Sequence, residues 1–123
     1  MPESIDRAEL TAFTQRAGDG PVVMLNLLKF RADGGAARYA QYGIAVAPLL
    51  ERVGGRPVFA ANPAEGLISG EDWDLMILVE YPTRQAFLDM VGSPEYAAIA
   101  HLREESLERS RLQATDPMTL PDA

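Results

Sequence analysis

Residues 22–30 (VVMLNLLKF) form an almost unbroken apolar run, and this run constrains the fold more than any other segment of the chain. An apolar run of this length between turn residues predicts a buried β-strand. Successive side chains of a strand point to opposite faces, and here both faces are mostly apolar. The strand therefore needs cover on both sides, and Asn26 in its middle must find hydrogen-bond partners.

The hydrophobic periodicity and the turn residues predict one helix followed by a β-α-β-β-α-β order. The expected elements are a helix over 4–17, a strand over 22–30, a helix over 35–53, strands over 56–61 and 73–81, helices over about 83–91 and 94–109, and a strand over about 110–115. This order implies an α+β, ferredoxin-like domain, in which one antiparallel sheet carries helices on one face. We expect an N-terminal helix and turn at 1–20, the ferredoxin-like domain at 21–116 and a C-terminal tail at 117–123.

A single layer of helices leaves the second apolar face of the sheet exposed. Exposed apolar faces of this kind mark association sites on soluble proteins, and most soluble oligomers are symmetric assemblies of one chain. We therefore expect a homodimer that associates through the uncovered face of the sheet.

The composition argues against several classes of function. The 123 residues have a formal net charge of −7 and no dense run of Lys and Arg, which argues against a nucleic-acid partner. Cysteine is absent, and the one histidine, His101, falls among glutamates on a polar helix face, so we expect no thiolate nucleophile and no metal site. No apolar stretch reaches the roughly 20 residues that span a bilayer, and the N-terminus lacks the features of a signal peptide. We expect a single-domain, soluble, cytoplasmic protein without a membrane partner.

Arg103 is the first candidate residue of a ligand pocket. On a helix over 94–109, it falls in the apolar sector with Tyr96, so its guanidinium faces the sheet. A buried guanidinium needs a partner. Three alternatives stay open: a structural ion pair with a carboxylate such as Asp74 or Glu80, a side chain that extends to the surface, or a ligand anion.

Asn26 is the second candidate, and it has two interpretations. A buried amide can hydrogen-bond to neighbouring backbone at an irregularity of the strand. It can also face a wet or ligand-filled cleft, where its NH₂ group would polarise a carbonyl or stabilise an oxyanion.

Four aromatic residues complete the candidate pocket. Tyr39 and Tyr42 lie on the apolar face of the helix over 35–53. Trp73 and Tyr81 share the apolar face of the strand that begins at residue 73, which puts them in the same layer as Arg103. Aromatic residues at such spacing form either core or pocket walls, and their polar groups need partners in both cases.

Three segments together carry a family resemblance: VVMLNLLKF, the Tyr39–Tyr42 pair followed by APLLERVGGRPV, and WDLMILVEYPTRQAFLDMVGSPEYAAIAHLRE. They resemble the domain of unknown function 1330 group, within the dimeric α+β barrel superfamily. The resemblance implies a ferredoxin-like dimer with a pocket between the sheet and the helices of each subunit. Better understood relatives include cofactor-free monooxygenases of aromatic polyketides and small haem-degrading enzymes.

The resemblance to the haem-degrading type is partial. Asn26 and the helix start at 84–89 match it, whereas its axial histidine falls on or near Ala100 and its supporting tryptophan on Met90. We therefore expect no haem and no other cofactor.

Three hypotheses for function follow. The first is a cofactor-independent enzyme, monooxygenase- or isomerase-like, that acts on a small, partly apolar anionic or carbonyl compound. Arg103 would anchor the anion, Asn26 would orient a carbonyl, and Tyr39 or Tyr42 would shuttle or donate a proton. The second is a dimer that binds or senses a small ligand without turnover, and the third is a purely structural dimer.

Overall fold

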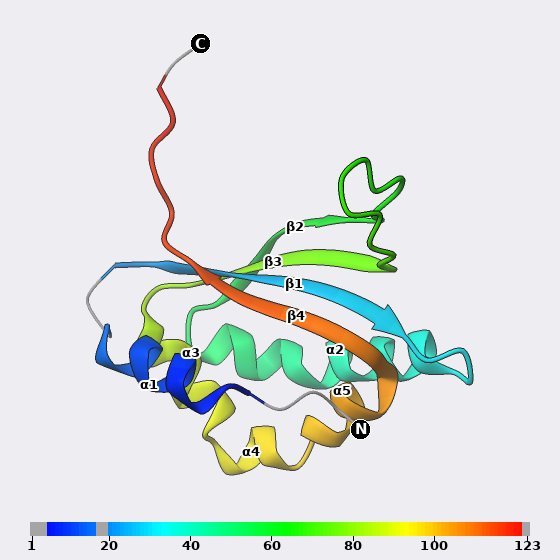
Figure 1. The fold of residues 1–123 in the computed structure, drawn as a ribbon. Helices are drawn as coiled ribbons and strands as arrows, with labels where there is room; N and C mark the ends of the chain where they lie inside the picture. The colour runs from blue at the N-terminus through cyan, green and yellow to red at the C-terminus, as the bar shows by residue number, and fades with distance from the viewer. Residues whose placement is uncertain (1–4, 17–19, 122–123) are drawn as a thin grey trace.

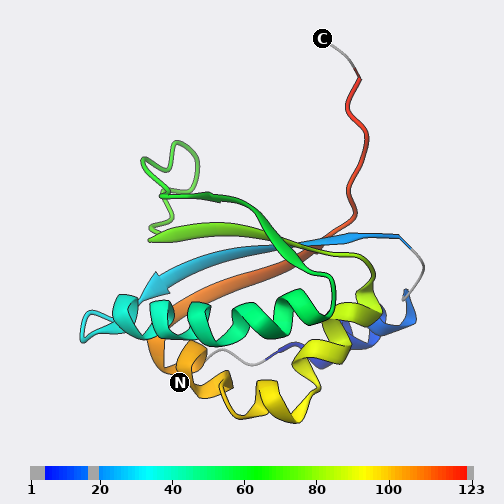
Figure 2. The ribbon, with the colours of Figure 1, turned by 180° about the vertical axis from the view of Figure 1, so that it is seen from behind.

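Helices cover one face of a four-stranded sheet and leave the other face open (Figures 1 and 2). The computed structural model describes residues 5–16 and 20–121 of the chain. Its elements are α1 (Arg7–Gln15), β1 (Val22–Phe30), α2 (Gly35–Arg52), β2 (Arg56–Ala61), β3 (Leu75–Tyr81), α3 (Arg84–Val91), α4 (Pro94–Ala97), α5 (Ala100–Ser106) and β4 (Leu107–Thr115). The predicted N-terminal helix is present as α1, although both ends of its predicted range, at 4 and 17, lie outside the described residues.

The strand order confirms the predicted ferredoxin-like class. The strands follow the order β2-β3-β1-β4, and all neighbouring pairs are antiparallel. β1 and β2 flank β3, so the β1-α2-β2 unit is split by a strand that comes later in the chain. β1 lies in the interior of the sheet, as its apolar sequence requires.

The two faces of β1 differ in burial. Val22, Met24 and Leu28 point toward the helices and are almost fully buried, whereas the alternate residues on the open face are half-buried. Asn26 shares the helix-facing side and pairs with Ile77 on one side and Leu112 on the other. The polar side chain therefore lies in the layer between the sheet and the helices.

Helix α2 is the longest element and runs through Pro48 without interruption. It begins at Gly35, where a Cβ atom would collide with the backbone carbonyl of Ser106. The preceding Gly34 has a φ of 95°, a conformation that glycine adopts readily. The two glycines let the start of α2 approach the end of α5 closely.

The predicted helix over 94–109 is wrong in its extent. Ser93 caps a short helix, α4, and the chain then forms α5 and enters β4 at Leu107. Residues 107–109 pair with the end of β1, where Phe30 is opposite Leu107. This backbone pairing overrides the helical periodicity of the segment.

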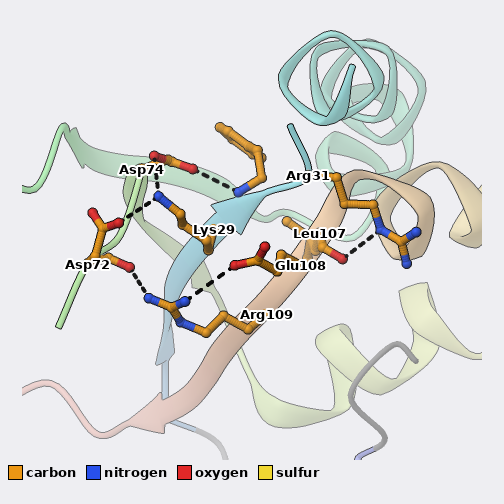
Figure 3. A network of polar contacts seen from close by, with 8 residues as sticks. Lys29, Arg31, Asp72, Asp74, Leu107, Glu108 and Arg109 are labelled. Atoms are coloured by element: carbon orange, nitrogen blue, oxygen red, sulfur yellow. Dashed lines mark hydrogen bonds and ion pairs between the residues drawn. The ribbon is translucent and has the colours of Figure 1, made fainter. Parts of the chain in front are cut away.

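The predicted strand over 73–81 also begins later, at Leu75. The polar network of Figure 3 holds the residues just before it: the Asp74 carboxylate accepts from the backbone N–H of Phe30 at 2.8 Å and pairs with Lys29 Nζ at 3.4 Å. Lys29 Nζ also lies 2.7 Å from Asp72 Oδ2, and Arg109 donates to the Asp72 carbonyl. These contacts fix residues 72–74 beside the end of β1 and the start of β4.

Candidate functional site

A cavity of about 620 Å³ lies between the helix-facing side of the sheet and helices α2, α3, α4 and α5. Most of its lining is apolar, with side chains from β1, β3, β4 and α2. All four tyrosines of the chain line it: Tyr39, Tyr42, Tyr81 and Tyr96. Asn26 and Arg103 line it as well. A pocket of this size with a few convergent polar groups is the usual form of a small-molecule site.

Asn26 and Arg103 are direct neighbours in this cavity. Arg103 Nη2 donates a hydrogen bond of 3.3 Å to Asn26 Oδ1. The amide nitrogen of Asn26 lies 3.4 Å from the carbonyl oxygen of Met24 and 3.5 Å from that of Ile77, so both of these bonds are long. The amide therefore hydrogen-bonds to neighbouring backbone and also orients the guanidinium.

Arg103 has no carboxylate partner among the residues that the structure describes. Of the two partners considered from the sequence, Asp74 pairs with Lys29 and Glu80 pairs with Arg56, at 3.2 Å. The interpretation of Arg103 as the ion-pair partner of Asp74 or Glu80 is therefore wrong. The guanidinium is half-buried, its described partner is a neutral amide, and its planar fork of donors is suited to a carboxylate or enolate oxygen.

The tyrosines form a connected aromatic wall. The hydroxyls of Tyr42 and Tyr96 lie 2.9 Å apart, so one donates to the other and joins α2 to α4. The rings of Tyr39 and Tyr42 are 5.5 Å apart, and Tyr81 packs edge-on against Phe87 at 5.2 Å. These contacts hold the rings in place around the cavity.

The pKa values of three tyrosines are raised. Burial raises the pKa of Tyr39, Tyr42 and Tyr81, and the positive charge of Arg103 opposes this rise at each of them. Burial has the larger effect, because the phenolate would lose its hydration. These hydroxyls are therefore protonated at neutral pH and carry a hydrogen that can be donated.

The structure brings five of the six sequence-predicted residues to the cavity, and Trp73 is the exception. Trp73 packs under the guanidinium groups of Arg109 and Arg111, at 4.8 and 5.5 Å from its ring centre. Both arginines alternate along β4 with Leu112, which lines the cavity, so they point to the opposite face. The predicted position of Trp73 is wrong because β3 begins at Leu75, and strand alternation does not extend to residue 73.

Tyr96 was absent from the sequence-based set of pocket residues. Tyr96 shares the apolar sector of the predicted helix over 94–109 with Arg103. This shared position is the sequence signal that could have identified it as a pocket residue.

Several other features bear on the site. His101 is exposed, as its polar helix face predicted, and does not line the cavity. Across residues 5–16 and 20–121, no three His, Cys, Asp or Glu side chains lie close enough together to hold a metal ion. Within the same ranges, the helices are too short or too polar to span a membrane.

Comparisons with known proteins agree with this fold. Residues 34–114 match the model of the family described as "Domain of unknown function (DUF1330)". The chain is similar to a solved protein of unknown function from Rhodopseudomonas palustris, RPA0582, with 30% identity and a TM-score of 0.86, over 95% of this chain and 97% of that chain. No match was found among curated proteins.

More distant structures share the fold alone. A dimeric ferredoxin-like protein of unknown function from Jannaschia sp. CCS1 has 11% identity and a TM-score of 0.64, over 80% of this chain and 100% of that chain. Hydroxynitrile lyase from Passiflora edulis has 11% identity and a TM-score of 0.64, over 85% of this chain and 100% of that chain. A protein described as an enzyme and a protein of unknown function therefore share this architecture.

Proposed function

The chain belongs to the DUF1330 family, whose function is not assigned, and we propose that it is a homodimeric, cofactor-independent enzyme for a small, partly apolar compound that carries an anionic or carbonyl oxygen. The observation that carries this proposal is Arg103. A half-buried guanidinium whose described partner is a neutral amide lines a cavity that is otherwise largely apolar. A cation in such a place is costly unless an anionic group completes the site.

The proposed chemistry is monooxygenase- or isomerase-like, because both reactions can pass through an enolate. Arg103 holds the developing negative oxygen, with Asn26 fixing the orientation of the guanidinium. Burial raises the pKa of Tyr42 and keeps its hydroxyl protonated, so Tyr42, held by its contact with Tyr96, donates a hydrogen bond to the same oxygen and no proton leaves it.

The proposed dimer forms through the open face of the sheet. This face carries Leu25 and Leu27 of β1, Leu78 of β3 and the exposed Phe59 of β2, which is opposite Leu78. An apolar face of this kind favours self-association, and related folds include proteins described as dimeric. Light scattering at micromolar concentration tests it: we expect a dimer for wild type, a monomer for Leu78→Arg, and a dimer for the control Ile44→Arg on the helical side. A monomeric wild type would refute the dimer.

Ligand binding is tested with benzoate and with dimedone, a cyclic diketone that forms an enolate, as the first members of a panel. We expect both to raise the melting temperature of wild type saturably, and Arg103→Met to abolish the effect. Arg52→Met is the matched control, since Arg52 lies on α2 outside the cavity and pairs with Glu95.

Mass spectrometry of the incubated panel then decides between turnover and binding. A reaction product from any panel compound would support the proposal that the protein is an enzyme. Saturable binding without product from any member favours the alternative, a binding or sensing dimer. The absence of any binding would leave the purely structural dimer.

A further inference from the structure

A second cavity, of about 630 Å³, lies between helix α1, helix α3 and strand β4, on the helical side of the sheet (Figure 1). Helix α1 contributes Leu10 and Phe13 to its lining, β4 contributes Leu112, and α3 contributes Phe87. No residue of α1 is buried, so the helix leaves this space beside β4 unfilled. We call it the α1 cavity, and the cavity described above the central cavity.

The two cavities adjoin each other. Five residues line both of them: Ile5, Met24, Phe87, Arg103 and Leu112. The buried ring of Phe87 packs against Tyr81 at 5.2 Å and against Phe13 at 5.5 Å. Tyr81 lines the central cavity and Phe13 lines the α1 cavity, so one row of aromatic rings extends from one cavity into the other.

Arg103 therefore lies at the junction of the two cavities. Its guanidinium has five N–H donors, and among the described residues Asn26 accepts from one of them. The other arginines that line the α1 cavity lie within ion-pair distance of carboxylates: Arg16 and Arg84 share Asp116, and Arg111 is 3.9 Å from Glu71. The cation that remains for a ligand thus stands between two spaces.

We propose that the ligand places its anionic oxygen at this junction, on Arg103, and extends one apolar group into each cavity. This inference rests on the proposed function and narrows its substrate class. The substrate would carry its anionic or carbonyl oxygen between two apolar groups, as an enolisable diketone with a substituent on each side does. Each group adds affinity in proportion to the apolar area that it removes from water.

Three carboxylates test this arrangement by isothermal titration calorimetry. Phenylacetate has one ring, diphenylacetate has a ring on each side of the carboxylate-bearing carbon, and 4-biphenylylacetate is an isomer of diphenylacetate with its two rings in line. Wild type should bind diphenylacetate at least about tenfold more tightly than phenylacetate, because the second ring enters the α1 cavity. Arg103→Met should abolish the binding of both.

Two variants fill the α1 cavity from different positions of α1: Ala12→Trp and Leu10→Trp. Each should weaken diphenylacetate about tenfold, to the affinity of phenylacetate, and should leave phenylacetate and 4-biphenylylacetate unchanged. Ala8→Trp is the matched control, because Ala8 is an exposed residue of the same helix that lines neither cavity. It should bind all three ligands as wild type does. Thermal melts establish that the variants are folded.

A crystal structure of the diphenylacetate complex gives a second readout that needs no variant. One ring should contact Phe13 in the α1 cavity and the other should contact the tyrosines of the central cavity. Both rings on the same side of Arg103 would overturn the proposal.

The binding results separate this inference from the proposed function. Diphenylacetate that binds wild type no more tightly than phenylacetate, or that keeps its advantage in both folded filled variants, would overturn the inference. Equal losses for all three ligands in those variants would overturn it as well. In each case Arg103-dependent binding of phenylacetate would leave the proposed function standing. If wild type bound none of the three, or bound them equally well without Arg103, the proposed function and this inference would both fail.

Discussion

Arg103→Met should change the stability of the protein very little, although it removes a half-buried charge from the interior. The variant loses the 3.3 Å hydrogen bond to Asn26 Oδ1, and the amide is only 8% exposed. An unsatisfied buried acceptor costs about 1–3 kcal/mol. The same change removes a partly desolvated cation that has no carboxylate partner among the described residues, and this removal is favourable.

The two effects nearly cancel, so we expect a net change of about 1 kcal/mol or less in the free energy of unfolding. With a urea m-value of about 2 kcal/mol per molar, the midpoint would move by about 0.5 M or less. Breaking a true buried ion pair would instead cost about 3–5 kcal/mol.

Arg84→Met is the comparison, because Arg84 is more deeply buried than Arg103 and does have a carboxylate partner. Its guanidinium lies 2.9 Å from Asp116 and packs against the ring of Phe13. Urea unfolding of both variants at one fixed protein concentration, which a dimer requires, should show the larger loss for Arg84→Met. A loss of about 3 kcal/mol or more for Arg103→Met would refute the reasoning, because Arg103 would then be a structural residue.

Two further predictions concern pH. Burial raises the pKa of Tyr42 and Tyr81 above 10.0, so below about pH 10 both the folded and unfolded states hold these protons. As the pH rises further, the unfolded state alone loses them, and stability should fall by up to about 1.4 kcal/mol per pH unit for each tyrosine. Urea unfolding from about pH 9 to about pH 11 checks this, and Tyr42→Phe should show a shallower fall; a flat profile for wild type would contradict it. Hydrogen bonds from Arg16 and Arg84 lower the pKa of Asp116, so it stabilises the fold above its unfolded pKa and that stability is lost as the pH falls through the folded pKa. Asp116→Asn should therefore be less stable at neutral pH and should lose less on acidification than wild type in an acid titration; identical acid limbs would contradict this.

Much of the fold was predictable because alternation in β1 depends only on the local sequence. The alternation of side chains along a strand predicts that Asn26 shares a face with Met24 and Leu28. The sheet register agrees with this prediction. The helical periodicity independently predicts that Arg103 faces the sheet. The hydrogen bond between Arg103 and Asn26 agrees with both predictions.

The failures arise where tertiary contacts end an element. Nothing in the periodicity of 94–109 indicates that Leu107 will pair with Phe30, and that pairing ends the helix. Likewise, Asp74 is held by the end of β1, which removes Trp73 from the strand and places it under two arginines. Such contacts join residues far apart in the sequence, and local patterns do not encode them.

The position of β1 has a consequence for synthesis on the ribosome. Both neighbours of this strand come much later in the chain: Asn26 pairs with Ile77 and with Leu112. At roughly 5–20 residues per second, the nascent chain needs about 4–17 s to extend from the end of β1 to the end of β4. Until β3 has been synthesised, this strand has no partner on either edge, and its edge toward β4 stays unpaired for the whole interval. The segment that later forms the centre of the sheet is therefore the segment of the nascent protein with the greatest need for a chaperone.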